Sequence, residues 1–212
     1  MLIIVNVTIF LVLWLSDAFL LRGVPSLERA IWEFGEIPWY IIRGQKLYTV
    51  FTSMFLHADL IHLGGNMLFL YIFGDNVEDA FGHNRYILFY LLSGIVASMI
   101  YLVSVVYTAD LTGLIYPAIG ASGAIAGVLG AYLVMYPTAK ILTLVLIGWV
   151  VVVPVPAILF LGLWFVYQML YGVLALGLEV VTGVAYWAHI GGFVAGIFFG
   201  LGWRGRRHVP VT

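Results

Sequence analysis

Long, almost uncharged runs of apolar residues constrain this chain more than any other feature. A helix needs about 20 apolar residues to cross the hydrocarbon of a bilayer, and residues 2–21 and 86–107 both reach that length. Across the chain, 64% of residues are hydrophobic and 9% are charged, whereas about 25% of the residues in a typical soluble domain are charged. The sequence therefore predicts an all-α integral membrane protein.

Six segments of this kind follow one another along the chain. The expected spans cover residues 2–21, 60–78, 86–107, 119–136, 157–178 and 184–203. The long first loop, residues 22–59, contains Trp and Tyr, which favour membrane interfaces. We expect short helices and partial embedding in this loop. We interpret residues 1–212 as a single membrane domain with almost no soluble extension.

One further apolar stretch, Ile141 to Val153, is too short for a span, rich in β-branched residues and followed by Pro154. We interpret it as a connection that lies against the bundle near one interface. This choice matters because two crossings then separate Ser122 from His189, so both lie near the same membrane face. A third crossing would place them on opposite faces.

The basic residues indicate an orientation. Basic residues beside a span favour the cytoplasmic side of the membrane. With six spans, both termini lie on one side, together with the basic residues Arg85, Lys140, Arg204, Arg206 and Arg207. We therefore expect a multi-pass protein of the cell membrane with cytoplasmic termini. Ser122 and His189 would then lie toward the outer face.

Two polar side chains inside small-residue runs carry the chemistry. Ser122 lies in Gly120-Ala121-Ser122-Gly123, and His189 is followed by Gly191 and Gly192. Polar groups are costly in lipid and often functional, and a hydroxyl beside an imidazole is typical of a nucleophile and its base. Glycine ladders alone indicate only helix packing, but serine and histidine on those faces favour peptide-bond chemistry.

The second span begins with further polar groups, His57, His62 and Asn66. His62 and Asn66 lie four residues apart on one helical face, where they could donate hydrogen bonds to an oxyanion. We assign His57, Gly120 and Gly123 to the support of the same site. The simpler alternative is that these are hydrated polar residues at a helix N-terminus near the membrane interface.

Other kinds of site receive less support. A metal site could use His57, Asp59, His62 and His189, but no HExxH pattern exists. A haem site would pair imidazoles across helices and would need neither Ser122 nor Asn66. The absence of cysteine excludes disulfides and thiolate catalysis, and a net charge of −1 argues against nucleic-acid binding. We expect no metal and no cofactor.

Taken in order, these motifs resemble those of the rhomboid family of intramembrane serine proteases. The matching residues are His57-Ala58, His62, Asn66, the Gly-Ala-Ser-Gly run at 120–123 and Ala188-His189 with Gly191-Gly192; Phe73 to Glu78 and Phe89 to Gly94 are also similar. The resemblance implies the minimal six-helix prokaryotic type, with a Ser-His dyad that lacks an acid. It also implies a water-filled cavity and cleavage of transmembrane segments of other proteins.

Two departures and one alternative accompany the resemblance. Many relatives carry an aromatic residue beneath the histidine, four positions after the serine, but this chain has Ala126. The first loop also lacks the Trp-Arg pair common in relatives. The alternative function is a non-proteolytic quality-control protein that binds unstable transmembrane helices; inactive relatives of that type lose the serine or histidine, and both are present here.

The fifth expected span, residues 157–178, is the best candidate for a helix that yields to substrate. It follows Pro154 and Pro156 and carries large residues such as Trp164 instead of a glycine ladder. Large side chains hold helices further apart and make them easier to separate. We interpret Gln168 in the same span as an interhelical hydrogen-bonder. The sequence leaves the oligomeric state open.

Overall fold

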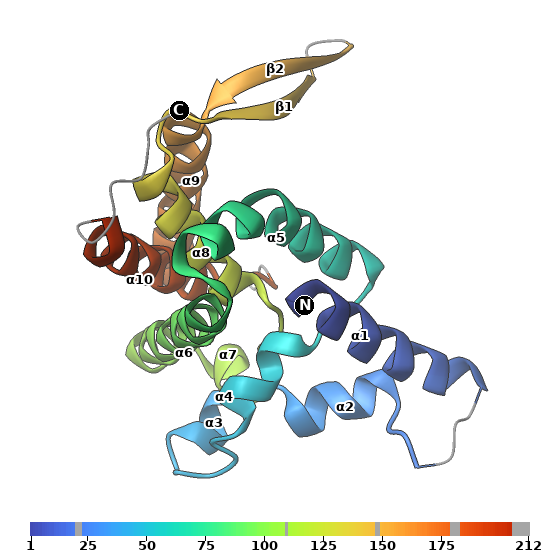
Figure 1. Cartoon of the computed structure of the whole chain (residues 1–212). Helices are drawn as coiled ribbons and strands as arrows, with labels where there is room; N and C mark the ends of the chain where they lie inside the picture. The colour runs from blue at the N-terminus through green and yellow to red at the C-terminus, as the bar shows by residue number, and fades with distance from the viewer. Residues whose placement is uncertain (20–22, 109, 147–148, 179–182, 205–212) are drawn as a thin grey trace.

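The chain folds into a bundle of helices with one β-hairpin at its edge (Figure 1). The computed structural model describes all residues except 20–22, 109, 147–148, 179–182 and 205–212. The long helices in the described part are α1 (Leu2–Phe19), α5 (Leu60–Phe81), α6 (His83–Thr108), α8 (Ser122–Met135), α9 (Ala157–Leu178) and α10 (Tyr186–Arg204). They coincide with the predicted spans to within a few residues, and the end of the first span lies outside the described residues.

The helices differ in their ability to cross a membrane. Within the described residues, α6 and α9 are each long and apolar enough to span it. The short pair α4 (Thr49–Thr52) and η1 (Ser53–Phe55) forms a third candidate with α5, bent by 92°. Helices α1 and α8 are apolar but shorter. The protein is thus a helical membrane bundle, and the count of six crossings stays a prediction.

Helix α8 lies at the centre of the bundle, packed between α10, α6 and α5. Its closest neighbour is α10, because glycines face each other across the contact. A Cβ on Gly192 would overlap the carbonyl oxygen of Gly123, and one on Gly196 would overlap that of Gly127. Only glycine lets the two backbones come this close. We call this contact the glycine seam, and it confirms the packing faces that the sequence predicted.

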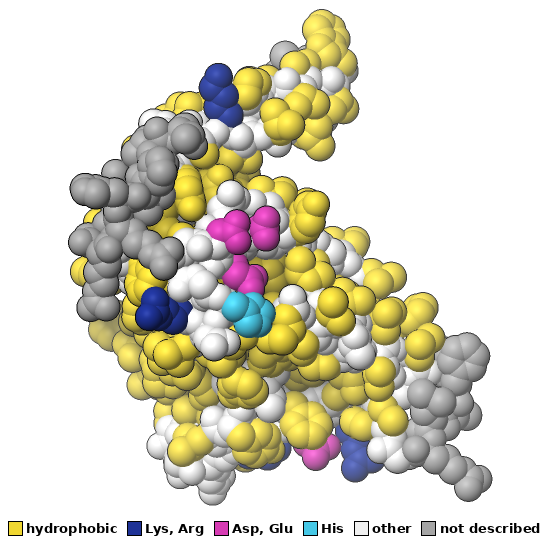
Figure 2. Space-filling view, in the orientation of Figure 1, with side chains coloured by type: hydrophobic (Ala, Val, Ile, Leu, Met, Phe, Trp, Pro, Cys, Tyr) yellow, Lys and Arg dark blue, Asp and Glu magenta, His cyan; other side chains and the backbone are white. Residues whose placement is uncertain are grey.

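Local sequence signals explain where α5 and α6 begin. Asp59 caps α5 by accepting a hydrogen bond from the backbone N–H of His62 at 2.8 Å. Gly82, with a φ of +79°, turns the chain from α5 into α6. Apolar side chains cover most of the visible face; acidic and histidine side chains form a small group near its centre, and the other charged side chains lie toward the edges (Figure 2). Such a surface suits contact with lipid.

The first loop contains the short helices that its sequence predicted. α2 (Leu27–Phe34) and α3 (Pro38–Ile41) precede α4 and η1. Glu36 forms two backbone hydrogen bonds with Ala118, of 3.0 and 2.8 Å. Ala118 lies between α7 (Leu111–Ile115) and α8. The loop is therefore attached to the segment that leads into Ser122.

The segment after α8 is an antiparallel hairpin of β1 (Lys140–Leu146) and β2 (Val150–Pro156), with Leu142 opposite Pro154. It projects away from the bundle (Figure 1), and the side chains of Leu142 and Leu144 are 73% and 68% exposed. The expectation that this stretch lies against the bundle is therefore wrong. Its run of β-branched residues favours strands, and two strands can satisfy each other's backbone groups without the bundle.

Candidate active site

Ser122 and His189 meet at the end of the glycine seam. Ser122 is the first residue of α8, and His189 lies in the first turn of α10. The Oγ of Ser122 is 2.8 Å from the Nε2 of His189, a hydrogen-bond distance. The seam brings the two helix starts together, so residues 67 positions apart in the chain become neighbours. This is the pair that the sequence singled out.

The turn before Ser122 depends on Gly120. Its φ is +122°, a backbone conformation that disfavours any residue with a side chain. The N–H of Gly120 donates to the carbonyl of Ser53 at 2.9 Å. A Cβ at Gly120 would lie 2.8 Å from the Nε2 of His62. Gly120 therefore allows His62 to approach the turn that presents Ser122.

His62 and Asn66 both lie at the start of α5, beside this turn. The backbone N–H of Ala58 donates to the Nδ1 of His62 at 3.4 Å, which leaves the proton of a neutral ring on Nε2, the atom facing Gly120. The side-chain amide of Asn66 donates to the carbonyl of His62 at 2.8 Å. An amide nitrogen carries two hydrogens, so one N–H of Asn66 remains for another acceptor.

His57 and Gly123 contribute through packing. His57 is fully buried, and its ring packs edge-on against His62 with centroids 5.1 Å apart. Neither of its ring nitrogens has a hydrogen-bond partner within the described residues. Gly123 lies at the crossing of α8 with α6, where an added Cβ would be 2.7 Å from that of Ala97. His57 thus packs against the ring of His62, and Gly123 allows α8 to lie close to α6.

Two residues of α9 complete the surroundings of His189. The Oε1 of Gln168 is 2.9 Å from the Nδ1 of His189, and the side chain of Gln168 is buried. The ring of Trp164 lies beside the imidazole, with centroids 6.1 Å apart and planes inclined by 35°. The prediction that Gln168 bonds between helices is confirmed. The sequence pattern did not identify His189 as its partner, and it did not predict the contact between Trp164 and His189.

The position beneath the histidine is filled differently from the aromatic pattern of many relatives. Ala126 is buried in the glycine seam, where a Cβ on Gly192 would lie 3.3 Å from its methyl group. There is no room there for a ring without a shift of α10. Trp164 instead brings an aromatic ring to His189 from α9.

The residues of the metal alternative have other contacts. Asp59 caps α5, His57 packs on His62, and His189 is bonded to Ser122. Within the described part of the chain, no three His, Cys, Asp or Glu side chains form a group able to hold a metal ion.

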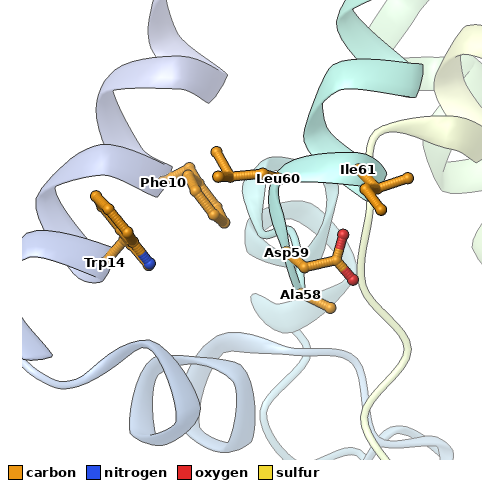
Figure 3. Close-up of a pocket in the computed structure, with 6 residues that line it drawn as sticks. All are labelled: Phe10, Trp14, Ala58, Asp59, Leu60 and Ile61. Carbon is orange, nitrogen blue, oxygen red and sulfur yellow. The ribbon is translucent and has the colours of Figure 1, made fainter.

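A shallow hollow of about 350 Å³ lies between α1 and the start of α5. Figure 3 shows Phe10 and Trp14 of α1 facing the residues that lead into α5. The lining residues are Phe10, Trp14, Ala58, Asp59, Leu60 and Ile61. Two of the lining residues adjoin His57 and His62 in the sequence, but neither Ser122 nor His189 lines the hollow.

Comparison with known proteins matches this arrangement to one family. A family model described as the rhomboid domain matches residues 44–206. The chain belongs to the rhomboid family. The match covers α5 to α10 and so contains every residue of the site described above. The resemblance drawn from the motifs is confirmed.

Curated rhomboid relatives come from a yeast, a bacterium and a plant. The chain is 33% identical over 155 residues to the mitochondrial Rhomboid protein 1 of Saccharomyces cerevisiae, covering 72% of this chain and 40% of the relative. It is 30% identical over 192 residues to the rhomboid protease GluP of Bacillus subtilis, covering 90% and 33%. It is 34% identical over 119 residues to the mitochondrial RHOMBOID-like protein 6 of Arabidopsis thaliana, covering 56% and 35%.

These relatives limit what can be transferred. The chain spans roughly a third to two fifths of the length of the three relatives. One is named as a protease, and two are named as mitochondrial. Membrane residence rests on the rhomboid domain and the spanning helices, while the cell membrane and the orientation expected from the basic residues stay predictions.

Proposed function

We propose that this rhomboid protein is a serine endopeptidase that cleaves transmembrane segments of other membrane proteins. The observation that carries the proposal is the 2.8 Å contact between the Oγ of Ser122 and the Nε2 of His189. A serine hydroxyl becomes an effective nucleophile when a base within hydrogen-bond reach removes its proton. The relative from Bacillus subtilis is named as a rhomboid protease, which supports the same chemistry.

The reaction needs donors for the oxyanion that forms on the scissile carbonyl. The backbone N–H of Ser122 lies at the start of α8, where the first N–H groups of a helix are unpaired. The Nε2–H of His62 and the second amide hydrogen of Asn66 lie on the neighbouring helix start. Loss of one oxyanion donor typically costs a factor of about 10²–10³ in kcat. His62→Ala and Asn66→Ala should each show such a loss; an unchanged kcat would return the residue to packing.

The proposed substrates are helices in the bilayer, because the candidate site belongs to a bundle with spanning helices. A peptide bond in a stable helix is shielded, so glycine and other weak helix formers near the cleavage site should help. The proposed setting is a cell membrane with the termini in the cytoplasm and Ser122 toward the outer face. No nucleic acid, metal or cofactor takes part in this mechanism.

The deciding experiment compares purified wild type, Ser122→Ala and His189→Ala in liposomes with a transmembrane reporter. Each variant should lose cleavage while keeping its fold, and the double variant should be no worse, since the two groups act as a unit. A fluorophosphonate probe should label wild type and not Ser122→Ala. Activity should survive EDTA and phenanthroline. Robust cleavage by Ser122→Ala would refute Ser122 as the nucleophile, whereas no cleavage by wild type would favour helix binding without proteolysis.

A further inference from the structure

The site contains a third polar side chain that the proposed dyad does not use. Gln168 is 5% exposed and lies in the middle of α9, a helix composed almost entirely of apolar residues. Its Oε1 is 2.9 Å from the Nδ1 of His189. The same imidazole therefore has Ser122 on one nitrogen and Gln168 on the other.

The two contacts together determine where the proton of the neutral ring must be. To accept the proton of Ser122, Nε2 must be unprotonated, so the ring proton has to be on Nδ1. An N–H on Nδ1 needs an acceptor, because a buried unpaired donor is costly. The Oε1 of Gln168 is that acceptor. With the amide reversed, its NH₂ would donate to Nδ1, the ring proton would move to Nε2, and Ser122 would lose its base.

We propose that Gln168 is a positioning residue that fixes His189 in the Nδ1–H tautomer and turns Nε2 toward Ser122. This inference rests on the proposed protease function. In acylation the O–H bond of Ser122 breaks, its proton goes to Nε2, and a bond forms between Oγ and the substrate carbonyl carbon while the C=O π pair moves to the oxyanion. The oxyanion then collapses, the C–N bond breaks, and Nε2 passes the proton to the leaving amine. The Nδ1–H stays on the ring and remains bonded to Gln168. Gln168 neither gains nor loses a proton.

A carboxamide suits this place better than a carboxylate does. An ionised carboxylate in a bundle within lipid is expensive, whereas an amide oxygen accepts the same hydrogen bond without a charge. Trp164 lies one helical turn before Gln168, so the two side chains project from one face of α9. Trp164 packs beside the ring, and Gln168 bonds to its Nδ1. Helix α9 thus holds the imidazole that α10 carries.

The test uses the full-length protein in liposomes and three variants. Gln168→Leu removes the acceptor, and Gln168→Glu keeps an oxygen in its place. Asn6→Leu is the matched control, because Asn6 is also a fully buried amide, but it bonds within α1 to the carbonyl of Leu2. We expect Gln168→Leu to lower kcat by about 10–100-fold with KM little changed, by analogy with loss of the hydrogen-bond partner that orients a metal-ligating histidine. Gln168→Glu keeps an acceptor oxygen but brings the cost of a carboxyl group in this place, so it should lose less kcat than Gln168→Leu, and Asn6→Leu should keep it.

The spectroscopic signature of the ring adds a readout that packing alone would not move. Nitrogen-15 NMR of labelled histidine, with His189 assigned from a His189→Gln variant, should show the Nδ1–H tautomer in wild type and a mixture in Gln168→Leu. An Nε2–H tautomer in wild type would overturn the inference even if Gln168→Leu failed to fold. So would a folded Gln168→Leu with kcat within twofold of wild type. Cleavage by Ser122→Ala would instead refute the proposed Ser122–His189 mechanism, and the tautomer would still report on Gln168.

Discussion

Helices α10 and α9 both reach the candidate site, but they pack in opposite ways. α10 lies on α8 with glycine against backbone, so that even a methyl group on Gly196 would overlap the carbonyl oxygen of Gly127. α9 carries large side chains, and those of Leu163 and Val166 are 69% and 61% exposed. Gly162 in α9 has open space where a Cβ would lie. Helix α10 is therefore held by close backbone contacts, whereas α9 is held by contacts of its side chains.

The difference separates two tasks. The glycine seam fixes the backbones that carry Ser122 and His189, so the distance between the two residues depends on α8 and α10. The orientation of the imidazole depends on Gln168 and Trp164, which belong to α9. A helix that moves to admit substrate would then also release the ring.

The largest expected effect comes from closing α9 against α5. The rings of Phe73 and Phe160 stack across this boundary with centroids 6.3 Å apart. The chain has no cysteine, so Phe73→Cys with Phe160→Cys can be bridged selectively by a short bifunctional thiosulfonate. Bridging should reduce cleavage of a transmembrane reporter more than tenfold and affect a soluble peptide less, because only the former needs α9 to move. Reductant should restore activity; undiminished cleavage of the reporter by the bridged protein would disprove lateral entry.

The same structure changes how α9 should be trimmed. Trp164 is one of the large residues that make this helix easy to separate, but its ring packs beside those of His189 and Phe193. Its loss would disturb the base as well as the packing. Phe160, which contacts Phe73 of α5, is the better place to loosen the helix without touching the imidazole.

The next effect compares one substitution at two glycines. Gly196→Ala should destabilise the protein by about 3 kcal/mol or more, since the methyl group meets backbone that cannot move aside. Gly162→Ala should be neutral or stabilise by up to about 1 kcal/mol, because alanine is the better helix former and has space there. Thermal unfolding in one detergent measures both. Equal melting temperatures for the two variants would show that the seam is no more rigid than α9.

These contrasts mark how far the sequence could predict the structure. The six long helices and the Ser122–His189 pair were predictable because apolar length and small-residue faces are local patterns. The predicted span begins at residue 119, before the actual start of α8 at Ser122, because the apolar run continues through the turn that the positive φ of Gly120 creates. The partner of Gln168 was not predictable, since it depends on how α9 is rotated about its axis. The hairpin at 140–156 was missed because a short apolar run fits several structures.

A pH-dependent effect should follow from Glu36, which ties the first loop to the segment before Ser122. Burial raises the pKa of its carboxyl from 4.5 to about 7, and the nearby Ser98 hydroxyl offsets this only in part. The unfolded chain therefore loses this proton at lower pH than the folded protein does. Stability should fall as pH rises from about 4.5 through 7.

Glu36→Gln isolates this contribution because it keeps the shape and removes the charge. The variant should match wild type near pH 4.5 and exceed it at pH 8, by up to about 3 kcal/mol for a shift of this size. Melting temperatures across pH 4.5 to 8 provide the measurement, with Glu28→Gln on the exposed side of the same loop as the control. A variant less stable than wild type at pH 8 would mean that the carboxylate has a stabilising partner.

The smallest effect tests whether support for His189 can move from α9 to α8. Ala126→Phe would place an aromatic ring four residues after Ser122, but Ala126 is 1% exposed and faces Gly192 across the seam. Overpacking should cost about 1–3 kcal/mol, a fall of roughly 2–12 °C in melting temperature. Val166→Phe on the exposed face of α9 should cost little. Trp164→Ala should lower kcat by itself; if adding Ala126→Phe restored kcat without loss of stability, the seam would have more room than its glycines indicate, and α9 would no longer be needed to hold the ring.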